Sequence, residues 1–188
     1  DLVLLPDWMD EAFISQLRDA NIKVYVHKTP DTVNEQRQLV MEIAKLVGEE
    51  EKGSSIVAWM DEKLKEIEDR VKDIKDEDKL RVINSNFGYT YAKGSMFDDM
   101  AQKAGLVNAA SEIGLEGFVE ISKEKIVEMN PDMIVLSSWS YDDSTDPEAY
   151  MQDILNDRSL AEVNAVKNNR VVALQDKHLY AVSHWVVL

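Results

Sequence analysis

The sequence predicts an α/β protein whose parallel sheets are divided between two lobes joined by a helical tract. Short apolar runs alternate with amphipathic segments, as they do where helices cover parallel sheets. Residues 32–78 show helical periodicity without a strand, which is too long for an ordinary connection inside one compact α/β unit. A third observation is an internal similarity: an aspartate followed by four apolar residues occurs at Asp1 and again at Asp132.

The N-terminal residues predict one strand-helix-strand unit. The apolar run 1–5, bounded by Pro6, is typical of a buried parallel strand. Apolar residues spaced along one helical face follow as far as Leu17, and Asn21 supplies a stop. The β-branched run 23–26 then predicts the second strand of the unit.

Two helices are predicted for the strand-free tract. The first starts at Pro30-Asp31-Thr32, which supplies a good cap, and its apolar positions continue to Gly48. We expect a break at the Gly-Ser-Ser of residues 53–55 and a second helix over 56–74 with one narrow apolar stripe. Because the tract separates two strand-rich regions, we interpret residues 32–78 as a connector between lobes formed by residues 1–31 and 79–188.

The second strand-rich region predicts strands and helices in alternation. Helices are expected after Ser95 and Ser122, which are good caps. Residues 87–91, between the first strand and the first helix, predict a loop that carries three aromatic side chains. The other predicted elements are strands at 80–83, 133–136, 170–174 and near 179–182, and helical pieces near 148–155 and 159–163.

Composition excludes several classes of function. The chain has 21 Lys and Arg against 36 Asp and Glu, so its net charge of −15 would repel nucleic acid. It has no cysteine, which excludes disulfides, thiolate metal sites and cysteine nucleophiles but does not decide the compartment. No run of 18 apolar residues is present to span a bilayer.

The internal similarity extends to a tryptophan in each half. Trp8 and Trp139 both stand seven places after the aspartate that opens the strand pattern. In parallel α/β sheets, the residues just beyond a strand's carboxyl end form the ligand crevice. The simpler alternative is that each tryptophan packs a helix on its sheet. Two matching offsets favour the interpretation that both tryptophans face a shared cleft between the lobes.

One stretch of the sequence resembles a family signature. Residues 119–136, VEISKEKIVEMNPDMIVL, are similar to a motif of the solute-binding proteins of iron-siderophore, haem and vitamin B12 importers. Residues 94–108 and 160–171 support the resemblance, which covers nearly the whole chain. It implies two Rossmann-like lobes with parallel sheets joined by a long helix. It also implies that the N-terminal lobe is incomplete in this chain, whose two ends read as cut from a longer one.

The resemblance carries expectations about function. It implies a solute-binding component of an ABC importer, located in the periplasm or at the cell surface as a lipoprotein, that captures an iron-siderophore, haem or cobalamin-type ligand between its lobes. The partners are then the metal-complex ligand and a membrane permease, with no catalysis and no resident cofactor. In that family a glutamate on each lobe docks onto permease arginines, and Glu124 stands at the matching position of the second lobe. Alternatively, the negative charge of Glu124 simply stabilises the positive N-terminal end of its helix.

The candidate ligand contacts are aromatic residues placed after strand ends. Aromatic rings cover large planar ligands well, and tyrosine adds a hydroxyl group that can donate a hydrogen bond or ligate iron. Each of these side chains could instead belong to the core. The candidates are Trp8, Phe87, Tyr89, Tyr91, Trp139 and Tyr141.

Three alternatives remain. An enzyme on a two-lobed scaffold lacks support, because no phosphate-binding glycine loop or nucleophile motif occurs. A zinc or manganese binder needs converging ligands, and His27, His178 and His184 lack a ligand spacing. A surface interaction module would be favoured if both tryptophans were buried. We also expect the exposed strand edges of an incomplete lobe to promote self-association.

Overall fold

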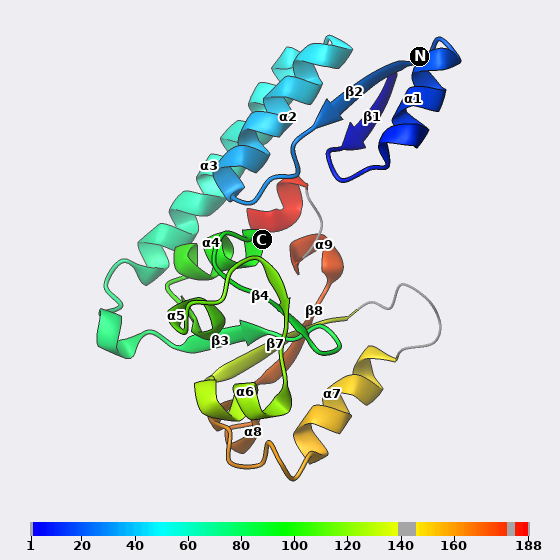
Figure 1. Cartoon of the computed structure of the whole chain (residues 1–188). Helices are drawn as coiled ribbons and strands as arrows, with labels where there is room; N and C mark the ends of the chain where they lie inside the picture. Colours follow the sequence, from blue (N-terminus) through cyan, green and yellow to red (C-terminus); the bar gives the residue numbers. More distant parts are fainter. Residues whose placement is uncertain (1, 139–145, 180–182, 188) are drawn as a thin grey trace. The chain divides into compact units, whose positions relative to one another are not determined.

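The computed structural model describes residues 2–138, 146–179 and 183–187. The chain divides into two compact units, Asp1–Pro30 and Asp31–Leu188. Trp139 and Tyr141 therefore lie outside the described residues. Each unit is built around parallel strands, and its elements can be followed in Figure 1.

The first unit is the predicted strand-helix-strand unit. Strands β1 (Leu2–Pro6) and β2 (Lys23–His27) pair in parallel, with Leu2 opposite Lys23. Helix α1 (Glu11–Asp19) connects them, and its Ile14 is buried. The helix begins where it does because the Asp10 carboxylate accepts a hydrogen bond from the Phe13 backbone N–H at 2.9 Å.

The second unit starts with two helices, α2 (Val33–Val47) and α3 (Glu50–Val71). Thr32 caps α2, and Gly48 ends it in the left-handed conformation, with φ 74°. The predicted break at residues 53–55 is wrong, because these residues lie inside α3. Gly53 serves close packing instead: a Cβ there would collide with the Cβ of Ala44 on α2.

A parallel sheet of four strands forms the centre of the second unit. Its order is β5-β3-β7-β8, so the strands alternate with helices as the sequence predicts. The strands are β3 (Arg81–Asn84), β5 (Val107–Asn108), β7 (Met133–Ser137) and β8 (Val171–Leu174). The α/β class with parallel sheets is thus confirmed.

Both faces of this sheet are covered. Because side chains alternate along a strand, Ile83 and Ile134 join one apolar cluster while Val82 and Val135 join another. The α-helices that follow α3 in this unit are α4 (Met96–Lys103), α5 (Ala109–Glu112), α6 (Lys123–Met129), α7 (Pro147–Asn156), α8 (Asn164–Lys167) and α9 (Asp176–Leu179). Residues of α6 and α7 pack on the Ile134 face and residues of α4 and α9 on the Val135 face.

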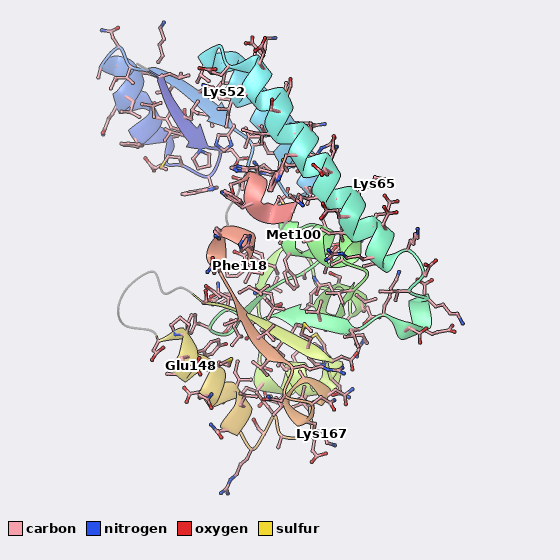
Figure 2. All side chains as sticks on the ribbon, turned by 180° about the vertical axis from the view of Figure 1, so that it is seen from behind. Lys52, Lys65, Met100, Phe118, Glu148 and Lys167 are labelled. Carbon is pink, nitrogen blue, oxygen red and sulfur yellow. The ribbon has the colours of Figure 1, made fainter. Side chains whose placement is uncertain are left out.

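Two short 3₁₀ helices complete the second unit, η1 (Asp76–Asp78) and η2 (His184–Val187). Val186 and Val187 of η2 are buried with Val33 and Met60 of the two long helices. The outward face of α3 is charged, and its Lys65 forms an ion pair with Asp69 at 3.1 Å (Figure 2). The polar and apolar sides of α3 therefore separate as its single apolar stripe predicts.

An antiparallel ribbon replaces the loop predicted for residues 87–91. Strands β4 (Tyr89–Tyr91) and β6 (Phe118–Glu120) pair with Tyr91 opposite Phe118. The prediction was wrong because the partner strand comes from a segment far along the chain, which no local pattern revealed. Thr90 faces the interior and is fully buried, so the two tyrosines lie on the opposite side of the ribbon.

Two predictions near the C-terminus also fail. Residues 159–163 form turns rather than a helix, and α8 begins only at Asn164. Leu179, the start of the predicted last strand, is the final residue of helix α9, and residues 180–182 lie outside the described part of the chain. Short segments such as these hold too few residues for periodicity to separate turn, strand and helix.

Candidate functional site

The antiparallel ribbon brings three aromatic rings together. Tyr89 stacks on Phe118 with ring centres 4.9 Å apart, and Tyr91 lies against the same ring at 4.6 Å. The register explains the arrangement, because Phe118 is directly opposite Tyr91 and diagonal to Tyr89 on one face of the ribbon. Tyr89 and Phe118 are nonetheless 42% and 50% exposed, so the stack forms part of the surface.

A tight turn leads into this ribbon and places a fourth ring. The backbone groups of Asn86 and Tyr89 exchange two hydrogen bonds, 2.9 and 3.0 Å long, across the pair Phe87-Gly88. Both central residues have positive φ, 46° at Phe87 and 89° at Gly88. Such turns ordinarily use asparagine, aspartate or glycine, and the left-handed conformation costs a bulky residue about 1 kcal/mol or more. Phe87 is therefore held in a strained position.

Stacking on a helix compensates part of that strain. The ring of Phe87 lies 4.3 Å from the ring of Tyr150 on α7, in a stacked arrangement. The hydroxyl group of Tyr150 in turn forms a hydrogen bond of 2.9 Å with the Ser85 hydroxyl group at the end of β3. Aromatic pairs of this kind contribute about 0.5–1.5 kcal/mol beyond the area they bury. Phe87 still leaves 42% of its surface exposed.

We call these five residues the aromatic surface: Phe87, Tyr89, Tyr91, Phe118 and Tyr150. Three of them were predicted from the sequence as ligand contacts, and the structure joins them in two stacks connected by one turn. Phe118 and Tyr150 were missed. Phe118 follows a glycine in a short polar stretch and Tyr150 lies within a helical pattern, so neither carried a local signal.

Trp8 is the most exposed of the predicted contacts. It lies in the turn directly after β1, with 71% of its surface accessible. The turn is fixed beside it by the Asp7 carboxylate, which accepts hydrogen bonds from the backbone and the hydroxyl group of Thr29 at 3.0 and 2.9 Å. These bonds lower the pKa of Asp7. The opposition of Trp8 and Trp139 stays a prediction, since Trp139 is outside the described residues.

Glu124 occupies the first turn of α6, on the surface. Its own backbone N–H and the Ser122 hydroxyl group donate to its carboxylate and lower the pKa of Glu124. The neighbouring Lys123 pairs with Asp157 instead. Among the described residues no lysine or arginine forms an ion pair with Glu124. Its charge is therefore presented to solvent.

The described residues contain no group of side chains suited to hold a metal ion. Within residues 2–138, 146–179 and 183–187, no three histidine, cysteine, aspartate or glutamate side chains converge as metal ligands. The Nδ1 of His178 donates a hydrogen bond of 3.1 Å to the Trp185 carbonyl oxygen, and His184 packs against Trp59 and Trp185. These two histidines therefore have structural partners in the second unit.

Comparison with known proteins gives one matching family. Residues 1–178 match the model of the family described as periplasmic binding protein. A Bacillus subtilis (strain 168) protein described as an uncharacterized ABC transporter substrate-binding lipoprotein, YvrC, is 31% identical over 162 residues. That match covers 84% of this chain and 48% of YvrC, and the chain spans about half the length of the curated relatives it matches.

Solved structures show the same fold. The apo form of the periplasmic heme-binding protein RhuT from Roseiflexus sp. RS-1 superposes with a TM-score of 0.85 at 19% identity, covering 99% of this chain and 71% of RhuT. The molybdate-bound Haemophilus influenzae protein MolA superposes with a TM-score of 0.81 at 22% identity, covering 100% of this chain and 61% of MolA. Identities this low establish the fold alone, and the two ligands named differ in size and charge.

Proposed function

Because this chain belongs to the periplasmic binding protein family, we propose that it is the solute-binding component of an ABC importer that captures a large metal complex. The ligand class is an iron-siderophore, haem or cobalamin-type molecule. The aromatic surface is the observation that supports this choice over a small ion. Exposed rings of this kind are costly to solvate and are used to cover apolar, planar or ring-bearing ligands.

Phe87 strengthens the proposal. A strained bulky residue at a turn that asparagine or glycine would fill without penalty indicates a function for the ring itself. Its side chain is also anchored by Tyr150, which fixes the orientation of the exposed ring face before any ligand arrives. Preorganised contacts of this type reduce the entropy lost on binding.

Trp8 of the first unit is a further proposed ligand contact. Trp8, exposed beyond the carboxyl end of β1, is positioned as such crevice residues are in parallel sheets. Trp139 and Tyr141 follow β7 in the chain and complete the proposed contacts. In this scheme residues 1–31 belong to an N-terminal lobe, residues 32–78 form the connector, and residues 79–188 form the C-terminal lobe.

Glu124 is the proposed contact with the permease. Its carboxylate is exposed and ionised, and it can accept two parallel hydrogen bonds from one guanidinium group. The acidic character of the chain, with a net charge of −15, would speed its encounter with a basic surface. Function at a permease places the protein outside the cytoplasm, in the periplasm or attached to the cell surface. In the described part of the chain, none of the helices has the length and apolarity needed to cross a bilayer.

A ligand panel tests the proposal. Haem, a ferric siderophore, cobalamin, molybdate and zinc would each be titrated into the protein while tryptophan fluorescence and, for haem, visible absorbance are recorded. We expect saturable responses to one or more of the three large complexes and none to zinc. A response to molybdate alone, or to no member of the panel, would overturn the assignment of ligand class.

Glu124→Gln tests the docking role separately. This change removes the charge while keeping the shape of the side chain, so ligand affinity should be unchanged while ligand-loaded protein loses binding to permease vesicles. Glu128→Gln on the same helix is the matched control, because Glu128 already pairs with Lys125 at 2.9 Å. A loss of ligand affinity in Glu124→Gln would place this residue at the ligand site instead.

A further inference from the structure

A cavity of about 240 Å³ adjoins Tyr150 of the aromatic surface, inside the second unit. It opens between the sheet and the helices α6 and α7, on the face that carries Ile134. Its walls are mostly apolar, and Ser85, Lys123, Tyr150, Asp153 and Asp157 contribute the polar side chains. Its apolar walls include Ile126, Ile134, Ile154 and Leu160.

A hydroxyl pair marks one end of the cavity. Ser85 is only 3% exposed, and its hydroxyl group lies 2.9 Å from that of Tyr150. Either oxygen can be the donor, so the pair retains acceptor capacity for a third group. Phe87 stacks on the ring of Tyr150, and Gly88 lines the cavity directly. The same turn therefore carries an exposed ring of the aromatic surface and part of the cavity wall.

The charged margin disfavours anions. Asp157 accepts hydrogen bonds from Lys123 and from the backbone and hydroxyl groups of Ser159, which lowers the pKa of Asp157 to about 2. Its carboxylate is thus ionised and already satisfied. Asp153 adds a second negative charge near the single positive charge of Lys123. One lysine against two aspartates leaves a negative balance around the opening.

We propose that this cavity is a subsite for a neutral, phenol-sized aromatic group that carries a hydroxyl. The volume of 240 Å³ is smaller than the ~300–1,000 Å³ of pockets that hold whole drug-sized ligands, so it suits one substituent of a larger molecule. Apolar walls accept the ring, and the Ser85–Tyr150 pair orients its hydroxyl group. This inference rests on the proposed function and favours its iron-siderophore class, since the substituent would belong to the metal complex held at the aromatic surface, and haem and cobalamin carry no hydroxyphenyl group.

Fluorine NMR with small probes tests the subsite directly. We expect the para-fluorophenol signal to broaden and shift on titration with the protein, and fluorobenzene, which lacks the hydroxyl group, to bind roughly fivefold more weakly. The anion para-fluorobenzoate should not bind at concentrations that saturate with para-fluorophenol. Absence of para-fluorophenol binding, or equal binding of the benzoate, would overturn the proposal.

Filling the cavity supplies the decisive variants. Ile154→Phe adds volume to the wall from α7 and should weaken para-fluorophenol binding at least tenfold, and Leu160→Phe should do the same from the other side if the first variant folds poorly. Leu155→Phe is the matched control, because Leu155 packs against the same core without lining the cavity. Circular dichroism would confirm that each variant is folded. Unchanged probe affinity in both folded filling variants would refute the assignment.

Comparing the binding of the para-fluorophenol probe with the binding of a whole ligand tests this inference separately from the proposed function. Tyr89→Ala should weaken binding of a ferric siderophore and leave para-fluorophenol binding unchanged, because Tyr89 does not line the cavity. Tyr150→Phe should lower para-fluorophenol affinity roughly fivefold. Failure of the wild-type protein to bind a ferric siderophore, with intact para-fluorophenol binding, would count against the ligand class alone. Equal loss of para-fluorophenol binding in Tyr89→Ala and Tyr150→Phe would count against the subsite.

Discussion

The central sheet and the β4-β6 ribbon differ in how far their apolar side chains are buried. In the sheet, Ile83 and Ile134 are completely buried between layers of helices. In the ribbon, Tyr89 and Phe118 stack on each other yet remain about half exposed to solvent. Burial of apolar side chains in the sheet therefore stabilises the fold, whereas the ribbon leaves apolar ring surface exposed, where another molecule could contact it.

The change from buried to exposed side chains takes place within a few residues of the chain. Asn84, at the end of β3, is fully buried, and Phe87 already lies at the surface in a strained conformation. The carboxyl end of β3 thus marks the boundary between the supporting structure and the proposed site. Four variants test this boundary, from the largest expected effect to the smallest.

Ile134→Ala should produce the largest loss of stability. Its side chain is completely buried at the centre of the sheet, and truncation there costs about 2–5 kcal/mol through lost burial and a residual cavity. Urea unfolding measures the free energy of unfolding. Because the ribbon is untouched, affinity for the large complex that responds in the ligand panel should stay within a factor of two of the wild type under native conditions. A stability change as small as that of a surface variant would contradict the contrast.

Tyr89→Ala should have the opposite effect, a small loss of stability with a large loss of ligand affinity. Its ring is largely exposed, so the free energy of unfolding should fall by no more than about 1 kcal/mol, the value of one stacking pair. Affinity for the large complex that responds in the ligand panel should fall about tenfold, because a stacking contact of about 1–1.5 kcal/mol is removed. Val127→Ala, exposed on α6, serves as a control that should change neither quantity.

Phe87→Asn separates strain from contact. Asparagine adopts the left-handed conformation readily, so relief of about 1 kcal/mol of strain should offset the lost stacking on Tyr150. We expect an unfolding free energy within about 1 kcal/mol of the wild type together with weaker haem binding. If binding is retained instead, the ring of Phe87 has no part in the site.

Asp157→Asn should have the smallest effect, and only at acid pH. The folded-state pKa of Asp157 is lowered to about 2, so its ion pair with Lys123 contributes stability above about pH 4 that is lost as pH falls toward 2. Thermal unfolding midpoints of the variant should therefore depend less on pH across that window. An identical pH dependence in both proteins would show that the interaction persists in the unfolded state or does not form.

Local chemistry made much of the fold predictable. Thr32, Ser95 and Ser122 cap helices as expected, because a cap depends on a hydroxyl group and a backbone N–H three residues away. Glycine positions were harder to interpret. Gly48 ends a helix through its own backbone conformation, whereas Gly53 permits two helices to approach, and sequence alone does not distinguish these uses.

The sequence by itself determined the parallel strands, the helix caps and the family signature, since each depends on residues close together in the chain. Only the tertiary structure decided which aromatic rings meet. Tyr89 finds Phe118 through the register of a ribbon whose strands are distant in sequence, and Phe87 finds Tyr150 through the packing of α7 on the sheet. Contacts of this kind are fixed by the simultaneous burial of many other side chains, so no local pattern contains them.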